Sequence, residues 1–305
     1  MLLFLPGFVR TPLAALVFIV NTLVHCFVLF VFALLKLLLP VPVLKRGLTR
    51  VLNLIGESWI GVNNFATRLF ARIEWDIQGT EGLRYEGNYL VVSNHQSWVD
   101  IPFMHRALNR KIPFLKFFLK QQLIWVPVLG LAWWAFDFPF MKRYSKEFLE
   151  QHPELRGKDL ETTRRSCERF RAAPVSVMNF VEGTRFTAQK HAEQQSPFKH
   201  LLRPKAGGVA FVINAMGDII HSLIDVTIVY PGGRPTLVDL LAGRIRSASV
   251  LVRELPIPAD LVGGDYQNDP TYRERFQHWI TTLWTEKDER IEAALQAHPS
   301  TERIA

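Results

Sequence analysis

The sequence predicts an α/β fold, in which a mixed, largely parallel sheet is flanked by helices and preceded by a hydrophobic helical membrane anchor. Short apolar runs rich in β-forming residues, such as residues 89–93 and 175–180, alternate with stretches of helical periodicity. Strands that alternate with helices are typical of sheets in which most neighbours run parallel. An uncharged segment, residues 13–35, precedes all of them and is dominated by Leu, Val, Phe and Ala.

Composition limits the classes of partner. The chain has 305 residues, of which 49% are hydrophobic, so it can bury a sizeable core in one large or two modest domains. Its formal net charge of +8 suits nucleic acid, anionic lipid or phosphorylated substrates. Positive charge is interleaved with Phe and Trp in residues 101–147, and no zinc-finger, helix-turn-helix or RNA-binding signature accompanies it. We therefore expect a membrane surface as partner, and no nucleic acid.

Residues 1–72 are expected to form the anchor, and residues 73–305 the catalytic domain. Residues 13–35 are long enough to span a bilayer core and longer than the apolar part of a signal peptide. The alternatives are a helix that lies in one leaflet and a buried helix of a soluble protein. A second, amphipathic helix is expected over residues 50–73, lying on the membrane. The positive-inside rule places the catalytic domain in the cytoplasm, because four basic residues follow the apolar segment: Lys36, Lys45, Arg46 and Arg50.

The elements of the catalytic domain follow from the same patterns. Apolar runs bounded by Gly, Pro or polar residues predict strands at residues 73–77, 89–93, 112–115, 137–140, 175–180, 223–230 and 249–255. Helical spacing predicts a helix that ends near Leu108, another that opens at Lys120 and stops at Pro127 and Gly130, and helices over residues 159–171, 205–215 and 269–297. The polar segment of residues 187–204 is expected to be a mobile flap.

A polar segment, residues 94–100, directly follows the strand of residues 89–93. It places His95 and Asp100 five positions apart, which in a regular helix would turn them about 140° from each other. They can meet only if a loop or a first helical turn folds back between them. If they meet, the Asp100 carboxylate fixes the tautomer of His95 and leaves the other ring nitrogen basic. The alternative is that His95 caps the next helix and Asp100 belongs to its first turn.

A second motif follows the strand of residues 175–180. Gly183 permits a tight turn there, and Arg185 can bind an anion with its planar, five-donor guanidinium. The alternative for Arg185 is a surface ion pair with Glu182.

The two motifs together resemble the glycerolipid acyltransferase family, the lysophosphatidic acid acyltransferases of PlsC type. That family carries N-H-x-x-x-x-D, here at residues 94–100, and F-x-E-G-T-R, here at residues 180–185. The resemblance spans roughly residues 75–230, and longer runs look like the YihG branch of bacterial inner-membrane acyltransferases. Lys120 begins a further family block, K-x-x-L-x-x-x-P-x-x-G, and Arg143 matches the basic residue of another. The family's usual Pro-Val pair in the fourth block is absent here, where residues 225–230 stand instead.

The resemblance implies transfer of a fatty acyl group from a thioester to the sn-2 hydroxyl of lysophosphatidic acid, giving phosphatidic acid. His95 and Asp100 would form the general-base dyad, and the substrate would supply the hydroxyl that a Ser-His-Asp triad contains. No Gly-x-Ser-x-Gly motif is present, so no covalent acyl-enzyme is expected. Glu182 would hold a glycerol oxygen of the acceptor or orient Arg185. The other substrate-binding residues would be Gly183, Thr184, Arg185, Arg143 and Lys120, with solvated surface charges as the alternative for the last two.

No metal or cofactor is expected, because the two cysteines, Cys26 and Cys167, and the scattered histidines lack metal-ligand spacing. The expected partners are a phospholipid bilayer, a lysophospholipid acceptor and a donor on coenzyme A or acyl carrier protein. The expected location is a bacterial inner membrane, with the catalytic domain in the cytoplasm. Two other functions stay open: an acyltransferase of the same fold with another acceptor, such as a lyso-ornithine lipid, and a non-enzymatic membrane scaffold. The sequence leaves the donor carrier, the acyl-chain preference and the oligomeric state open.

Overall fold

A six-stranded sheet is the centre of the computed structural model, which describes residues 1–39, 41–141, 170 and 173–297. All neighbouring strands run parallel except β7 and β8, which are antiparallel. The expectation of a mixed, largely parallel sheet is therefore confirmed. In spatial order the strands are β1 (Glu74–Gln78), β8 (Ser247–Pro256), β7 (Ser222–Val229), β2 (Tyr89–Ser93), β6 (Ser176–Phe180) and β3 (Leu115–Phe117).

The register of the central strands brings the two sequence motifs to one edge of the sheet. Every residue of β2 is buried, as expected for a parallel strand that is covered on both faces. Ser93, the last residue of β2, lies opposite Phe180 at the end of β6 and opposite Val226 in β7. The loops that follow β2, β6 and β7 therefore leave the same edge of the sheet and lie next to one another.

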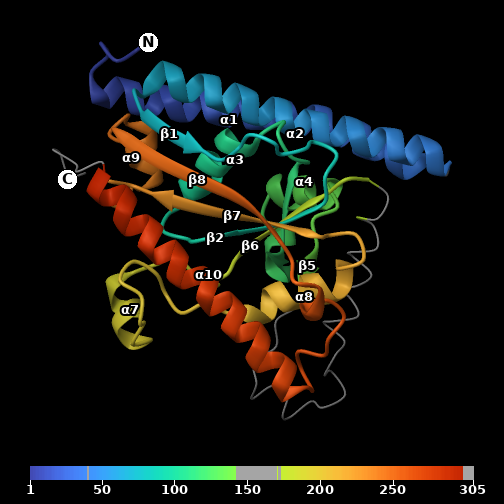
Figure 1. Ribbon diagram of the computed structural model, residues 1–305. Coiled ribbons are helices and arrows are strands. Elements are labelled where there is room, and N and C mark those ends of the chain that lie inside the picture. Colours follow the sequence, from blue (N-terminus) through green and yellow to red (C-terminus); the bar gives the residue numbers. More distant parts are fainter. Residues whose placement is uncertain (40, 142–169, 171–172, 298–305) are drawn as a thin grey trace.

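Helices cover both faces of the sheet. On one face, α8 (Ala206–Met216) and α10 (Pro270–Ala297) pack over a core that includes the buried side chains Leu90, Val177 and Trp284. On the other face, α3 (Asp100–Leu108) and α9 (Leu237–Leu241) contribute to a second core. Figure 1 shows the long α10 running diagonally below the sheet.

Buried charges fix α10 to β7. Asp225 of β7 is fully buried and forms ion pairs with Lys287 and Arg290 of α10 and, at 2.8 Å, with Arg253 of β8. The fully buried Lys287 ammonium also donates a hydrogen bond of 2.6 Å to the carbonyl oxygen of Val226. Removal of one partner from such a pair typically costs about 3–5 kcal/mol, because an uncompensated buried charge remains. Asp225 thus has a structural role, although it lies in the block that departs from the family pattern.

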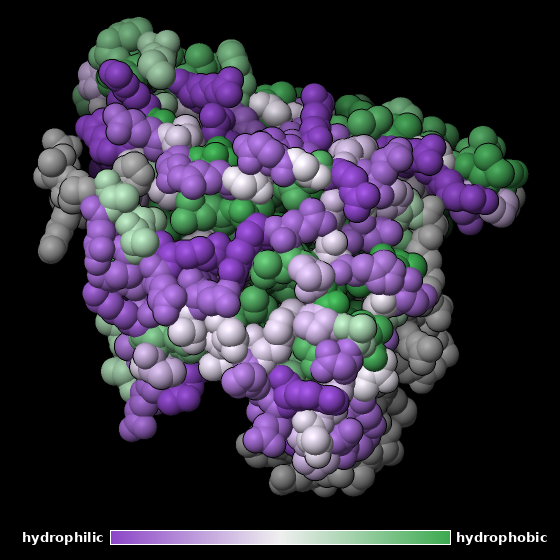
Figure 2. All heavy atoms as spheres, viewed as in Figure 1, coloured by the Kyte–Doolittle hydropathy of each residue, from purple (hydrophilic) through white to green (hydrophobic). Residues whose placement is uncertain are grey.

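The N-terminal residues form two long helices that run antiparallel, side by side, along the top of the molecule in Figure 1. They are α1 (Gly7–Leu38) and α2 (Pro42–Phe70), and the Asn21 amide donates a hydrogen bond of 2.7 Å to Asn63 between them. By length and composition α1 is apolar enough to cross a membrane. Of its most apolar stretch of 18 residues, 17% is buried in the protein. Figure 2 shows apolar side chains along the upper edge of the molecule, where these helices lie.

The second helix was expected to begin at residue 50, and this boundary is wrong, because α2 begins at Pro42. Proline fits the first position of a helix, where its fixed φ is suitable and its missing N–H has no partner to lose.

The segment after β3 also differs from its expected structure. The expected strand at residues 112–115 lies later, at Leu115–Phe117, and is followed by a small pair of strands, β4 (Leu119–Lys120) and β5 (Phe140–Met141). In place of one helix from Lys120 there are a 3-10 turn, η1 (Gln121–Trp125), and then α4 (Leu129–Ala135). Pro127 disfavours helical backbone at the residue before it and cannot donate a helical hydrogen bond. Gly130 lies inside α4 and does not end a helix. A Cβ at this position would be 2.0 Å from the carbonyl oxygen of Ile124, so the position requires glycine.

The segment of residues 187–204 packs and hydrogen-bonds against the rest of the protein, whereas a mobile flap was expected. It contains α7 (Ala188–Glu193), and its Leu201 and Leu202 side chains are fully buried. The Asp288 carboxylate of α10 accepts hydrogen bonds of 2.8 Å from the backbone N–H groups of Lys199 and His200. A 3-10 turn, η4 (Ala259–Leu261), completes the described elements before α10. The helix expected over residues 159–171 falls on a part of the chain outside the described residues, apart from Phe170.

Candidate active site

The loop between β2 and α3 folds back so that His95 and Asp100 meet. Residues 94–97 have no regular structure, and α3 begins at Asp100 itself. The Nδ1 atom of His95 lies 2.8 Å from Oδ2 of Asp100, whose side chain is fully buried. The backbone N–H groups of Gln96 and Ser97 donate to the same oxygen, at 2.6 and 2.8 Å. The expected contact is therefore present, and Asp100 also occupies the first turn of the helix.

Strand β7 and the segment after it hold the loop of residues 94–99 in place. The Asn94 side chain donates to the carbonyl oxygen of Ile228 and accepts from its N–H, each at 2.9 Å, so it extends the pairing of β2 with β7 by one residue. The Ser97 hydroxyl donates to the carbonyl oxygen of Pro235. The Tyr230 hydroxyl, just beyond β7, donates a hydrogen bond of 2.7 Å to Oδ1 of Asp100.

Glu182 holds the His95 loop against the turn after β6. Its fully buried carboxylate accepts a hydrogen bond of 2.9 Å from the N–H of His95 and one of 3.0 Å from the N–H of Leu202. The carbonyl oxygen of His95 in turn accepts one of 2.8 Å from the N–H of Phe186. Burial raises the pKa of Glu182 to about 7, although its two backbone donors favour the charged form. The Glu182 carboxylate thus faces two backbone N–H groups, and it forms no ion pair with Arg185.

The Glu-Gly-Thr-Arg turn depends on Gly183. Its φ of 69° lies in the left-handed region that favours glycine, and a Cβ there would lie 3.1 Å from the Lys205 side chain. Beside it, the Lys190 ammonium donates hydrogen bonds to the Thr184 hydroxyl, at 2.7 Å, and to the carbonyl oxygen of Arg185, at 3.2 Å. The turn is therefore held by hydrogen bonds from Lys190 and has two lysine side chains beside it.

Arg185 leaves this turn toward Trp98 of the His95 loop. Its guanidinium carbon lies 4.7 Å from the centroid of the Trp98 ring, a distance typical of a cation–π interaction. Among the described residues no carboxylate lies within ion-pair distance of Arg185, so the surface pair with Glu182 is not formed. An Arg that is held by an aromatic ring keeps its five donors available for an anion.

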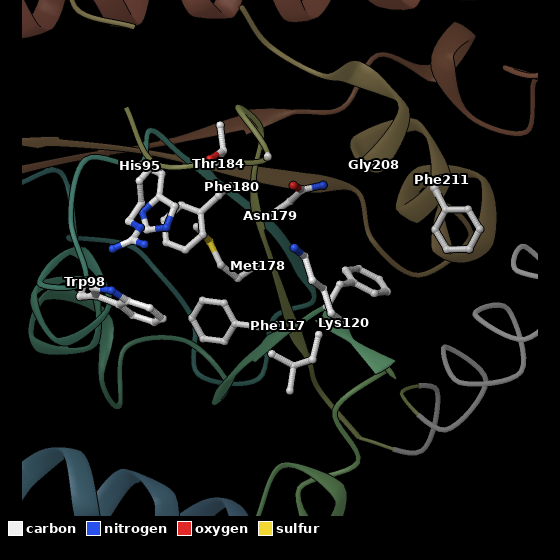
Figure 3. A pocket seen from close by; sticks show the side chains of 14 residues that line it. His95, Trp98, Phe117, Lys120, Met178, Asn179, Phe180, Thr184, Gly208 and Phe211 are labelled. Atoms are coloured by element: carbon white, nitrogen blue, oxygen red, sulfur yellow. The ribbon is translucent and has the colours of Figure 1, made fainter. Parts of the chain in front are cut away.

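A cavity of about 350 Å³ lies between the two motifs. Figure 3 shows His95, Trp98 and Thr184 at one end of it and Gly208 and Phe211 at the other. The His95 ring stacks on Phe180, with 3.9 Å between the ring centroids, and no described residue hydrogen-bonds its Nε2 atom. The cavity thus has a polar end with Arg185, and its body is mainly apolar apart from Lys120 and Asn179. It is lined by His95, Trp98, Phe117, Phe118, Leu119, Lys120, Met178, Asn179, Phe180, Gly183, Thr184, Arg185, Gly208 and Phe211.

The structure thus gathers most of the expected site residues and adds others. Lys120, Gly183, Thr184 and Arg185 line one cavity with His95, whereas Glu182 lies behind it. Arg143 lies outside the described residues. Sequence reasoning missed Trp98 and Tyr230; the position of Tyr230 at the end of an apolar strand run was the signal for the second. The described part of the chain holds no group of three His, Cys, Asp or Glu side chains that could bind a metal.

Comparisons with known proteins identify relatives of this chain. Residues 74–231 match a family model described as Acyltransferase. The 1-acyl-sn-glycerol-3-phosphate acyltransferase delta of Mus musculus is 26% identical over 215 residues, which cover 66% of this chain and 51% of that protein. The gamma form of Mus musculus is 25% identical over 184 residues, covering 57% of this chain and 44% of that protein. This chain therefore spans about half the length of these relatives.

The fold is also known. The crystal structure of the 1-acyl-sn-glycerophosphate (LPA) acyltransferase PlsC from Thermotoga maritima matches with a TM-score of 0.53 and 16% identity, over 94% of this chain and 98% of that one. These comparisons do not separate the branches of the family, so the YihG branch stays a prediction. The family model covers more than half of the residues, including both motifs and the strands that carry them, and the chain therefore belongs to the acyltransferase family.

Proposed function

We propose that this protein is a membrane-associated acyltransferase that moves a fatty acyl group from an acyl thioester to the sn-2 hydroxyl of lysophosphatidic acid, giving phosphatidic acid. The observation that carries the proposal is the hydrogen bond between His95 Nδ1 and the buried Asp100 carboxylate, in a cavity that also contains Arg185. The name of the relatives, 1-acyl-sn-glycerol-3-phosphate acyltransferase, supports this choice of acceptor.

The dyad supplies what an alcohol nucleophile lacks. A hydroxyl is a poor nucleophile at neutral pH, and its attack is assisted when a base accepts its proton. In our proposal Nε2 of His95 takes the proton while the acceptor oxygen bonds to the thioester carbonyl carbon. The carbon–sulfur bond then breaks, and the imidazolium returns the proton to the leaving thiolate. Asp100 holds the ring by Nδ1 and stabilises the imidazolium.

The cationic end of the cavity fits the phosphate of the acceptor. Arg185 contacts Trp98 at this end and has no carboxylate partner among the residues that the structure describes, and Lys120 lines the same cavity nearer its middle (Figure 3). Charge-assisted hydrogen bonds from a guanidinium to phosphate oxygens are short, strong and frequently bidentate. The apolar body of the cavity, with Phe117, Met178 and Phe211, suits acyl chains.

A replacement of Arg185 tests this phosphate contact. We expect Arg185→Lys to raise the KM for lysophosphatidic acid nearly as much as Arg185→Ala, by roughly 10- to 100-fold, because an ammonium lacks the planar fork and hydrogen bonds to charged groups are strong. The KM for the acyl donor should change much less. Initial rates with each substrate varied in turn give both constants, and the exposed Arg275→Lys on α10 is the matched control. Full activity of Arg185→Lys would favour a structural role for this residue.

Glu182 is proposed to position His95 instead of binding substrate. In Glu182→Gln, one of the two backbone N–H donors would face an amide NH₂ group, so one of the two hydrogen bonds is lost. We expect kcat to fall roughly 10-fold or more, as for loss of a hydrogen bond to a charged group, with little change in the KM for the acceptor. The control is the exposed Glu193→Gln on α7. A raised acceptor KM at unchanged kcat would instead support the original assignment to substrate binding.

The membrane part of the proposal rests on α1. Its apolar side chains, among them Leu16, Ile19, Leu23 and Phe27, are exposed in the isolated protein, and basic residues follow its C-terminal end. We place the catalytic domain on the cytoplasmic side of a bacterial inner membrane, on the basis of this charge distribution and the resemblance of the sequence blocks.

The decisive experiment is a substrate panel. Purified protein in phospholipid vesicles would receive lysophosphatidic acid, other lysophospholipids or a lyso-ornithine lipid, with acyl groups on coenzyme A or on acyl carrier protein. Products would be identified by mass. Phosphatidic acid should be the main product, and the faster donor identifies the carrier. Acylation of another lysolipid alone would correct the acceptor, and absence of transfer with every pair would indicate a scaffold.

A further inference from the structure

The two oxygens of the Asp100 carboxylate have separate partners. Oδ2 receives His95 Nδ1 and the backbone N–H groups of Gln96 and Ser97, all from its own loop. Oδ1 receives the Tyr230 hydroxyl at 2.7 Å, and no other described residue donates to it. Asp100 is fully buried and Tyr230 is 4% exposed. Water therefore has little access to Oδ1, and the hydrogen bond of this oxygen comes from Tyr230.

The Tyr230 ring is held in place by the core beneath α3. It packs against Phe103 of α3, with 5.6 Å between the ring centroids, and belongs to the core beneath that helix. Two residues earlier, Ile228 exchanges two hydrogen bonds with the Asn94 side chain, which fixes the end of β7 against the catalytic loop. Burial, together with the Asp100 charge, raises the pKa of Tyr230 well above its ordinary value, so the hydroxyl stays a donor at neutral pH.

We propose that Tyr230 is a positioning residue that acts through Asp100: its hydroxyl holds Oδ1 so that Oδ2 stays directed at Nδ1 of His95. This inference rests on the proposed role of His95 as the base. Without the hydroxyl, the carboxylate has one unsatisfied oxygen in a buried site and gains rotational freedom. Its negative charge is also less stabilised, so it attracts the proton on His95 more strongly.

Other charged groups near the dyad must be separated from this effect. Glu182 contacts the His95 backbone from the turn after β6, and its pKa of about 7 lies in the range of the test. Arg185 and Lys120 line the same cavity as His95. Arg234, on the loop after β7, lies over the Phe186 ring. From α10, Lys287 acts on Glu182. The pH profile is therefore recorded both in the natural sequence and in a Glu182→Gln background.

The experiment compares Tyr230→Phe with Tyr272→Phe. Tyr272 is also buried, and its hydroxyl donates a hydrogen bond of the same length, 2.7 Å, to the carbonyl oxygen of Leu261, with no link to Asp100. We expect Tyr230→Phe to lower kcat roughly tenfold, the scale of one hydrogen bond to a charged group, with both KM values within about twofold. The acid limb of its rate profile should move to higher pH in both backgrounds. Tyr272→Phe should leave the rate and the profile unchanged.

A double-mutant cycle distinguishes positioning from general damage. In an Asp100→Asn background, Tyr230→Phe should change kcat less than about twofold, because residues that act as a unit are not additive. Site-specific 3-fluorotyrosine at position 230 keeps the shape and strengthens the donor, so it should move the acid limb to lower pH even if the Phe variant folds poorly.

An unchanged pH profile in Tyr230→Phe would overturn the inference while the proposed function stands. So would an equal fall of kcat when Tyr230→Phe is added to the natural sequence and to Asp100→Asn. Activity of His95→Ala would instead overturn the proposed function. The two failures are therefore distinguishable.

Discussion

Replacement of His95 with alanine is expected to lower the rate of acyl transfer at least about 10³-fold, within the range that general-base catalysis contributes. The reason lies in the geometry of the cavity. The His95 ring lines the cavity while its Nδ1 atom is bound to a buried carboxylate, so Nε2 is the ring nitrogen that remains for the proton of a substrate hydroxyl. Product would be measured by mass from lysophosphatidic acid and an acyl thioester.

The loss should not come from unfolding. The His95 side chain is 14% exposed and makes one ring stack, with Phe180, and one hydrogen bond, with Asp100, which keeps three other donors in the alanine variant. The hydrogen bonds of Glu182 and Phe186 are to the backbone of His95 and also remain. Membrane binding and the thermal transition should therefore be close to those of the natural sequence. His221→Ala, at an exposed position at the start of β7, is the matched control. Substantial transfer by His95→Ala would mean that the base lies elsewhere.

The central strands could be predicted closely from the sequence. The strand expected at residues 89–93 is β2 without change, and the one at 175–180 differs from β6 by one residue. Both are continuous apolar runs bounded by polar residues, the pattern of strands buried on both faces. Boundaries that depend on proline were less predictable, since proline begins α2 at Pro42 but interrupts the expected helix at Pro127. The same residue type has opposite effects at the first position and in the interior of a helix.

The site could be predicted only in part, because several of its contacts join distant segments. His95 and Asp100 lie in one loop, so their spacing was enough to state the condition under which they meet. Glu182 was assigned to substrate, but whether a carboxylate faces a cavity or a backbone N–H depends on how two loops dock. The contact between Asp100 and Tyr230 depends on the register of β2 with β7, which no local pattern encodes. Trp98 lies at an unspecified position of the motif, and its contact with Arg185 depends on the same docking.

The contacts of Asp100 also determine what Asp100→Asn should do. Three N–H donors, from His95, Gln96 and Ser97, converge on Oδ2, whereas one hydroxyl, which can also accept, faces Oδ1. The amide oxygen of asparagine should therefore occupy the Oδ2 position and its NH₂ group should face Tyr230. In that orientation the His95 tautomer is kept, and what disappears is the negative charge that stabilises the imidazolium.

Asp100→Asn should accordingly lower kcat by about 10³-fold, somewhat less than the roughly 10⁴-fold loss in a serine protease, where the corresponding change also gives the wrong tautomer. The KM for each substrate should change little, because Asp100 is buried behind the loop and does not line the cavity. The measurement is steady-state kinetics across pH, with Asp260→Asn, at a position 58% exposed, as the control. A loss of less than tenfold, alongside an inactive His95→Ala, would show that His95 works without a charged partner. A loss equal to that of His95→Ala would show that the imidazole has no useful basicity without the carboxylate, and that the two side chains act as one base.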